Sequence, residues 1–421
     1  MKLTLSLVCA LLGVLSSSVQ AETVIRILHL QTNPKILAIW NEAAKQYESA
    51  NPGVKVQFNY LENEAFKAKL PTLLQSKDRP SAFHSWGGGV MHEQVASGIC
   101  KDITEQINEG GFAETFYPAT AQNFVVDGKA YGVPNDLAPI VFWYNKELCQ
   151  KAGVDPTQIK QWDDFMEAVK KLKAAGITPI AAGGKDKWPL HFYPALLMMR
   201  ILGKDGLQAA YEDKDGGFAN PQVLKAFQLY KELTALEPFH KGYLSNTYPE
   251  AAGVFHDGQA AFHLMGTWDL VDGRGNAADK KGLPNEKMGW FFFPEVKDGK
   301  GKANDLFASL DGWLVSKQAP KETVDFFKVW LGKEPQTKLA AEGLFISPVK
   351  GTAEVIKDPF MKAIAQEIET SDWIGIAIDQ LLGPDTGRVF NDVSADIAAG
   401  NMTPEAGVKA IEESWQQNKM D

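Results

Sequence analysis

The residues of this chain that are best suited to bind a ligand lie in a short turn containing a tryptophan and a carboxylate. The segment GQAAFHLMGTWDL, Gly258–Leu270, predicts a strand over 260–265, a sharp turn at Gly266 and Trp268 just beyond the strand. Binding clefts of α/β proteins lie outside strand ends. A lone tryptophan usually belongs to a core, but its place in a Gly-x-Trp-Asp turn favours a cleft. We therefore expect Trp268 to face a ligand.

The sequence lacks the short motifs of several common catalytic chemistries. No Gly-x-x-x-x-Gly-Lys-Ser/Thr loop is present, and Gly273-Arg274-Gly275 lacks the third glycine of a dinucleotide site. His92-Glu93 resembles the start of a zinc-protease motif, but Ala96 stands where the second histidine belongs. No Gly-x-Ser-x-Gly elbow occurs. We therefore predict neither a cofactor nor a metal.

The elements that must position these residues alternate between strands and helices. Residues 24–28 read as a strand, residues 54–58 alternate as a second strand, and apolar residues between them recur at helical spacing: Leu37, Trp40, Ala44 and Tyr47. A strand, a helix and a strand in so short a span predict a βαβ unit with parallel strands. Further helical stripes follow Trp162, Asn220-Pro221 and Thr403-Pro404. The pattern indicates the α/β class.

The length and the net charge of the chain limit which architectures and which partners are possible. A chain of 421 residues with 45% hydrophobic content exceeds one core, because single cores stop growing at roughly 250–300 residues. Two lobes are expected, and the absence of a Ser/Gly-rich linker indicates that the chain crosses between them more than once. The 43 basic and 52 acidic residues give a net charge of −9, which argues against nucleic acid as a partner.

Residues 1–21 are predicted to be a cleavable signal peptide. Lys2 precedes an apolar run from Leu3 to Leu15, and Val19-Gln20-Ala21 supplies small residues for cleavage after Ala21. The run is shorter than the ~18 residues that a membrane anchor needs. We expect a protein of the Gram-negative periplasm.

Two cysteines follow the predicted signal peptide. Cys100 and Cys149 have no metal-ligand spacing. In an oxidising compartment they form one candidate disulfide, slightly favoured over a pair of buried thiols.

A resemblance to a known family emerges from the order of several motifs. The turn at Trp268 is similar to the small-x-x-Gly-x-Trp signature of the extracellular solute-binding proteins of carbohydrate ABC transporters, which include maltodextrin- and raffinose-type binders. In the same order as in that family, the chain carries NPGVKVQF, RPSAFHSWGGG, SGICKDIT, DGKAYGVPND, WYNKELCQKAGVDP, ASLDGWLVSK and GNMTPEAG. The resemblance covers nearly all of residues 22–421.

The resemblance implies a type II periplasmic-binding-protein fold of two α/β lobes. Each lobe would hold a mainly parallel sheet flanked by helices, with the ligand in the cleft between the lobes. We expect an N-terminal lobe of residues 22–138 with 295–343, and a C-terminal lobe of residues 139–294 with 344–421. The crossings are predicted just after Asp136, near 291–294 and near 345–348.

The resemblance also implies a sugar site of aromatic faces and polar edges. The C–H faces of a pyranose lie against aromatic rings, and its hydroxyls bond to carboxylates and amides. The first stacking candidate is Trp268, followed by Trp86 and Trp188. Hydroxyl partners are expected at Asp136 and Asp311, with Asn135, His84, Asp379 and Trp373 as weaker candidates. In contrast, Trp40, Trp162, Trp313, Trp330 and Trp415, together with His29 and His263, are expected to be structural.

The loop after the first strand departs from the family. Many relatives carry a tryptophan or an acidic residue there, whereas this chain has His29-Leu30-Gln31-Thr32-Asn33. No ligand contact is therefore carried over to this loop, and the size of the sugar stays open.

The resemblance implies a non-enzymatic binding component of an ABC importer. Its partners would be a small sugar, permease subunits of the inner membrane and a separate ATPase, and the protein would be a monomer. The alternatives are a polyamine, glycerol phosphate or iron chelate bound in the same fold, or a secreted glycoside hydrolase built on a pair among Asp136, Asp311 and Asp379.

Overall fold

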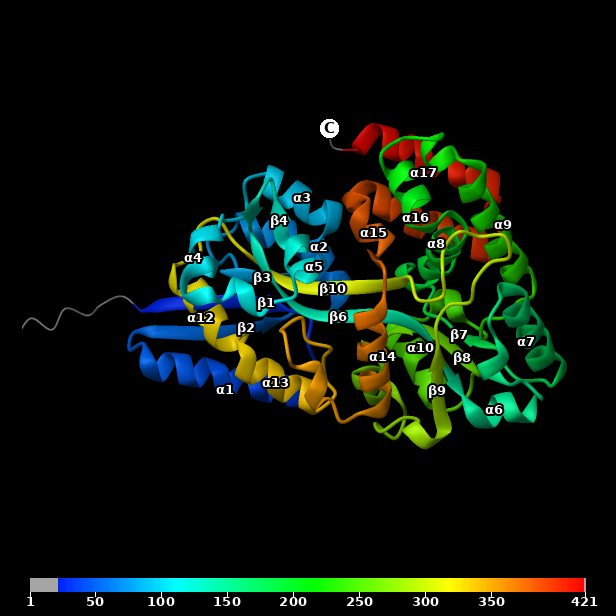
Figure 1. Ribbon diagram of the computed structural model, residues 1–421, viewed down its shortest axis with the longest axis horizontal. Helices are drawn as coiled ribbons and strands as arrows, with labels where there is room; N and C mark the ends of the chain where they lie inside the picture. Colours follow the sequence, from blue (N-terminus) through cyan, green and yellow to red (C-terminus); the bar gives the residue numbers. More distant parts are fainter. Residues whose placement is uncertain (1–21, 420–421) are drawn as a thin grey trace, which may run out of the picture.

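The computed structural model describes residues 22–419 as two lobes side by side (Figure 1). The predicted signal peptide lies outside the described residues. Within residues 22–419 no helix is long and apolar enough to cross a membrane. The type II two-lobe fold expected from the resemblance is confirmed.

The N-terminal lobe begins with the predicted βαβ unit. Strands β1 and β2 pair in parallel, from Thr23 opposite Val54 to His29 opposite Tyr60. The connecting helix α1 begins because the Asn33 side chain accepts a hydrogen bond from the Lys35 N–H beside Pro34. This lobe contains β1 (Thr23–His29), α1 (Pro34–Ala50), β2 (Val54–Tyr60), α2 (Asn63–Gln75), β3 (Ala82–Ser85), α3 (Gly88–Ala96), α4 (Thr104–Asn108), α5 (Pro118–Ala121), β4 (Val125–Val126), β5 (Lys129–Ala130), α12 (Glu322–Trp330) and α13 (Lys333–Ala341).

The C-terminal lobe is richer in helices. Capping boxes at Gln161 and Thr247 start two of them, and Thr403 caps the last. This lobe contains α6 (Lys146–Lys151), α7 (Trp162–Ala174), β7 (Ile180–Ala181), α8 (Trp188–Tyr211), α9 (Pro221–Ala235), α10 (Tyr248–His256), β8 (Phe262–Gly266), α11 (Trp268–Val271), β9 (Met288–Phe291), α14 (Pro359–Thr370), β11 (Ile374–Ile376), α15 (Ile378–Leu381), α16 (Gly383–Ala399) and α17 (Pro404–Asn418).

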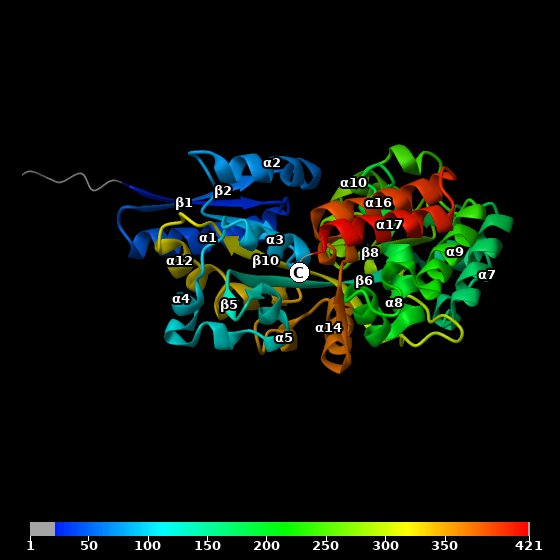
Figure 2. The ribbon, with the colours of Figure 1, turned by 90° about the horizontal axis from the view of Figure 1, so that it is seen from above.

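Two long antiparallel strands, β6 (Gly132–Asn145) and β10 (Leu306–Val315), run through both lobes (Figure 2). They form the centre of one sheet in the order β2-β1-β3-β10-β6-β8-β7, with β11 beside β10 and β9 beside β6. The first half of β6 pairs with β10, and residues 140–145 pair with β8 and β9. The parallel pairs are β1–β2 and β1–β3 on one flank, β7–β8 on the other flank, and β10–β11.

After residue 294 the chain passes back to the N-terminal lobe and then again to the C-terminal lobe. Residues 295–305 stay with the C-terminal lobe, because the buried Arg200 of α8 donates hydrogen bonds to the backbone oxygens of Phe293, Ala303 and Asp305. The chain returns along β10, where Phe307 joins the C-terminal core and Ala308 the N-terminal core. Residues 344–350 contact both lobes, because the Tyr117 N–H donates to the Pro348 oxygen whereas Ile346 belongs to the C-terminal core. The lobe boundaries at 294/295 and 343/344 stay predictions.

The disulfide predicted between Cys100 and Cys149 is contradicted by the structure. Cys100 and Cys149 are free buried thiols, and they belong to the cores of different lobes. Burial raises the pKa of each to about 12.

Candidate functional site

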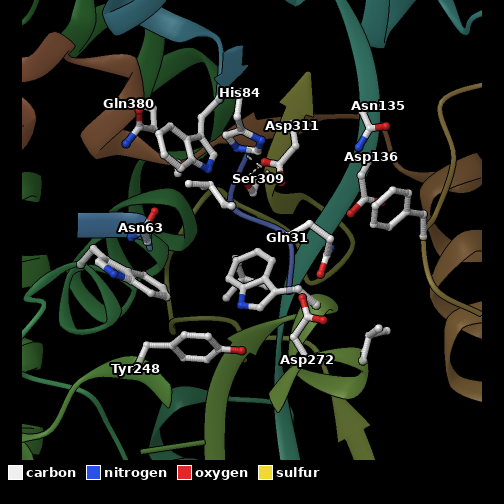
Figure 3. Close-up of a pocket in the computed structure, with 18 of the residues that line it drawn as sticks. Gln31, Asn63, His84, Asn135, Asp136, Tyr248, Asp272, Ser309, Asp311 and Gln380 are labelled. Atoms are coloured by element: carbon white, nitrogen blue, oxygen red, sulfur yellow. Dashed lines mark hydrogen bonds and ion pairs between the residues drawn. The ribbon is translucent and has the colours of Figure 1, made fainter. Parts of the chain in front are cut away.

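A cavity of about 230 Å³ lies between the lobes and receives side chains from both (Figure 3). Its wall includes Leu30, Gln31, Asn63, Lys67, His84, Trp86, Asn135, Asp136, Trp188, His191, Tyr248, Trp268, Asp272, Ser309, Asp311, Phe345, Asp379 and Gln380. The structure thus brings together every candidate from the sequence except Trp373. Trp373 lines neither this cavity nor the wider space of about 870 Å³ that adjoins it. Its backbone oxygen instead accepts from the Leu306 N–H, and its ring packs against the C-terminal core.

Trp268 forms one wall of the cavity, as its turn predicted. Strand β8 ends at Gly266, where a Cβ atom would overlap the Trp268 ring. The indole can fold back over the strand end only because this residue is glycine. Trp188, at the start of α8, has its ring centre 6.3 Å from that of Trp268, and Tyr248 lies 5.4 Å from Trp188. The C-terminal lobe therefore offers a cluster of aromatic faces.

A buried polar group lies beneath this aromatic cluster. Asp269 is fully buried, with its carboxylate 3.1 Å from His256 Nε2 and 3.5 Å from His263 Nε2, and it accepts a hydrogen bond from the Tyr248 hydroxyl. Burial favours the neutral acid, but the two imidazoles outweigh it and hold the pKa of Asp269 well below its usual range. His263 is structural, as predicted, and the network anchors Tyr248 beside Trp268.

The N-terminal lobe contributes Trp86 and His84 from the end of β3. Their rings meet edge to face at 4.6 Å, and Lys67 Nζ lies 5.5 Å from the Trp86 ring centre. Burial lowers the pKa of His84 to about 3, so this side chain is neutral at physiological pH. Its Nε2 is buried 3.9 Å from Asp311 and has no hydrogen-bond partner in the part of the chain that the structure describes.

Asp136 and Asp311 are brought together by the two long strands. They are directly opposed in the β6–β10 pairing, next to an irregularity between Asp311 and Gly312. Burial and the charge of Asp311 raise the pKa of Asp136 well above its usual value, although the Ile346 N–H donates to it. Burial also raises the pKa of Asp311 to about 6, against the opposing effect of the Ser309 hydroxyl, which donates at 2.6 Å. This edge of the cavity is rich in hydrogen-bond acceptors.

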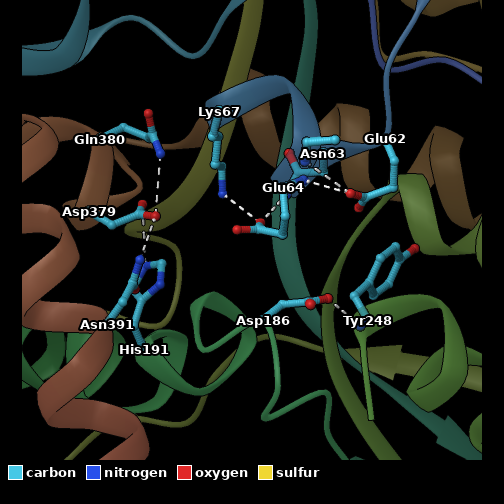
Figure 4. A network of polar contacts seen from close by, with 11 residues as sticks. Glu62, Asn63, Glu64, Lys67, Asp186, His191, Tyr248, Asp379, Gln380 and Asn391 are labelled. Carbon is cyan, nitrogen blue, oxygen red and sulfur yellow. Dashed lines mark hydrogen bonds and ion pairs between the residues drawn. The ribbon is translucent and has the colours of Figure 1, made fainter. Parts of the chain in front are cut away.

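A second polar edge is formed by α15 and α16 (Figure 4). Asp379 accepts hydrogen bonds from the amides of Gln380 and Asn391, and its carboxylate lies 3.7 Å from His191 Nε2. On the other side of the opening, Lys67 is paired with Glu64 at 3.0 Å. Asn135 contributes its side chain from β6, where its oxygen accepts from Gln336 at 3.4 Å.

Several lining residues were not anticipated. Gln31 follows β1 in the loop that departs from the family, Tyr248 begins α10, and Asp272 follows α11. Burial raises the pKa of Asp272 to about 7; the Asn33 amide opposes it, the charge of Asp269 adds to it, and the Gln31 amide opposes it more weakly. Asn63, Lys67, Ser309 and Gln380 also line the cavity. Only Asp272 could have been predicted from a local signal, because it follows Trp268 by four residues and residues at this spacing share one face of a helix.

The cavity continues into a wider space of about 870 Å³. The two share Lys67, His84, Trp86, Asp379 and Gln380 in their walls. The wider space runs between α2 and α3 of one lobe and the starts of α8 and α16 of the other. Beside it, α3 approaches the other lobe so closely that a Cβ on Gly89 would lie 2.5 Å from the Leu381 oxygen.

The chain is similar in sequence to proteins that bind extracellular solutes. The profile of the family described as bacterial extracellular solute-binding protein matches residues 32–337. An uncharacterised ABC transporter extracellular-binding protein of Pyrococcus horikoshii is 30% identical over 234 residues, which cover 53% of this chain and 51% of that protein. The chain thus spans about half the length of that relative. A probable sugar-binding periplasmic protein of Mesorhizobium japonicum is 28% identical over 252 residues, covering 59% of this chain and 58% of its own.

Solved structures share the whole fold. A chitin oligosaccharide binding protein superposes with a TM-score of 0.84 at 24% identity, covering 94% of this chain and 98% of the other. A solute-binding protein solved in complex with raffinose superposes with a TM-score of 0.74 at 19% identity, covering 94% of this chain and 99% of the other. At these identities the likeness establishes the fold.

Proposed function

Because the chain belongs to the bacterial extracellular solute-binding proteins, we propose that it captures a sugar between its lobes for an ABC importer. It works in the periplasm as a monomer, delivers the sugar to permease subunits in the inner membrane and leaves the sugar chemically unchanged. A separate ATPase supplies the energy of transport.

The observation that carries this proposal is the composition of the interlobe cavity. Trp268, Trp188 and Trp86 bring aromatic faces to it, and the C–H faces of a pyranose stack on such rings. Asp136, Asp311 and other carboxylate and amide side chains bring acceptors to the same space, where charge-assisted bonds to hydroxyls are stronger than neutral ones. Stacking faces with polar edges are the chemistry that a sugar ring requires.

Both lobes supply part of this site, so binding is coupled to closure. A sugar held by Trp268 and Trp188 in the open form gains the contacts of Trp86, Asp136 and Asp311 only when the lobes approach. The ligand therefore shifts the population toward the closed form by its differential affinity for that form. Strands β6 and β10 pass through both lobes and carry the hinge.

A titration with a panel of mono-, di- and oligosaccharides, followed by intrinsic tryptophan fluorescence and calorimetry, tests the proposal. We expect saturable binding of one sugar class and full chemical recovery of the sugar. Hydrolysis of the sugar would favour the glycosidase alternative, and silence across the panel would refute sugar as the ligand.

Trp268→Ala tests the stacking platform. Loss of this face should weaken binding by roughly 3 kcal/mol, more than a hundredfold in Kd. Trp290→Ala is the matched control, because Trp290 is also half-buried but lies on β9 outside both cavities. Equal affinities for the two variants would show that Trp268 is not the platform.

A further inference from the structure

The charges that line the cavity are strongly unbalanced. Asp136, Asp272, Asp311 and Asp379 all reach its wall. Within residues 22–419, Lys67 is the only Lys or Arg in that wall, and it is already paired with Glu64 at 3.0 Å. The other two basic groups of the wall are histidines, and burial lowers the pKa of both. The cavity therefore gathers four acidic groups without a matching cation among the described residues, and burial raises the pKa of Asp136, Asp272 and Asp311.

The hydrogen bonds that these acidic groups receive from residues 22–419 bring no Lys or Arg charge to them. Like charges directly opposed on neighbouring strands are destabilising, yet Asp136 and Asp311 occupy such a pair. Within the described part of the chain, no Lys or Arg lies within 4 Å of Asp136, Asp272, Asp311 or Asp379. A neutral sugar would satisfy some of their lone pairs but would supply no opposite charge, so any of these groups that stays ionised would be costly to bury when the lobes close.

Among residues 22–419, several buried polar atoms of this wall lack hydrogen-bond partners. They include His84 Nε2 next to Asp311, with only 8% of the residue exposed, and Asp272 Oδ1 on the opposite lobe. In Figure 3, Asp311 and His84 lie on one side of the cavity, with Asp136 and Asp272 bordering the same space. The arrangement is that of a polar site whose remaining partner comes from a ligand.

We infer that the ligand carries a protonated amine on a sugar ring, held by the carboxylates of Asp136, Asp311 and Asp272. This inference rests on the proposed function and specifies its substrate class as an amino sugar. The ring stacks on Trp268, and the ammonium group donates its hydrogen bonds to these groups and compensates the charge of one carboxylate. The tryptophan faces favour the cation as well.

A linear polyamine shares the ammonium chemistry but not the ring. It would bind to the carboxylates, but it would place only flexible methylene chains against the faces of Trp268 and Trp188. The paired aromatic faces therefore favour a ring. The titration described next distinguishes an amino sugar from a linear polyamine.

The test compares pairs of sugars in which one member carries a free amine and the other a neutral group at the same position. The protein, freed of co-purified ligand by unfolding and refolding, is titrated calorimetrically at about pH 7.5 with glucose and glucosamine, with galactose and galactosamine, and with chitobiose in its N-acetylated and deacetylated forms. Spermidine is the acyclic arm. We expect at least one amine-bearing sugar to bind roughly tenfold or more tightly than its neutral counterpart, an advantage that shrinks with added salt.

Each result bears on a different conclusion. Binding of neutral sugars with no gain from the amine overturns the inference and leaves the proposed function standing. Binding of spermidine alone, or of no ligand in the panel, overturns both.

Variants locate the ammonium site. Asp311→Asn and Asp136→Asn should each reduce the preference for the amine over the neutral counterpart by about tenfold. Glu413→Gln, an exposed acid on α17, should keep the preference of the parent. An unchanged preference in both aspartate variants, with thermal melts showing that they are folded, would overturn the assignment.

Discussion

The neutralisation of Asp311 should stabilise the ligand-free protein, which is an unusual outcome for a residue in the binding site. Burial raises the pKa of this carboxyl from 3.8 to about 6. A raised pKa means that the folded state binds the proton more tightly than the unfolded state. The contribution of Asp311 to stability therefore rises as the pH falls through 6 toward 3.8.

The magnitude follows from the size of the shift. Ionisation of Asp311 in the folded protein costs about 3 kcal/mol once the pH is well above both pKa values. Between about pH 7.5 and about pH 5, the protein should recover roughly 1.4 kcal/mol of this through Asp311 alone. The coupled Asp136 shifts in the same direction, since the charge of Asp311 raises its pKa as well.

Urea denaturation of the parent and of Asp311→Asn at both pH values measures the effect. At about pH 7.5 the variant should be more stable by up to about 3 kcal/mol, and the difference should shrink at about pH 5 because the parent carboxyl is then largely protonated. Glu413→Gln reports the effect of removing an exposed acid. A variant that is less stable than the parent at about pH 7.5, or a difference that does not change with pH, would refute the reasoning.

Three further predictions concern closure, the buried network and the thiols. Gly89→Ala should weaken sugar binding by about tenfold or more, because its Cβ obstructs the approach of the lobes. Small-angle scattering should show that this variant stays open. The control Gly275→Ala, which has open space around its Cβ, should close normally. Asp269→Asn should lower the free energy of unfolding by roughly 3–5 kcal/mol, since it breaks a fully buried charged network, and a urea midpoint equal to that of the parent would contradict this. Cys100 and Cys149 should react with a thiol reagent only after unfolding, and a reductant should leave the melting temperature unchanged; a shift on reduction would indicate a bond between them.

The parts of the fold that could be predicted from the sequence are those decided over a few residues. The βαβ unit follows from local periodicity and from the Asn33-Pro34 cap, and Trp268 follows from a glycine that lets the ring fold over the end of its own strand. Trp86 and Trp188 were found through the order of the motifs, and they share a cavity with Trp268. In each case the deciding residues are neighbours in the chain.

Local patterns are insufficient where distant segments of the chain decide the structure. Residues 295–305 belong to the C-terminal lobe because of Arg200, about a hundred residues earlier, whose guanidinium would otherwise be buried without partners. Trp373 packs into a core instead of the cavity, and no local pattern distinguishes the two. Gln31 reaches the cavity from a loop that carries no motif.

The sequence by itself determined the α/β elements, the likeness to solute-binding proteins and the aromatic half of the site, because periodicity, caps and glycine turns act locally. Only the tertiary structure decided which charges meet. Asp136 and Asp311 are 175 residues apart in the chain and become opposed through the pairing of β6 with β10, while Asp272 reaches the same cavity from the other lobe. The electrostatic character of a site depends on distances across the fold, and strand pairing and lobe packing set those distances.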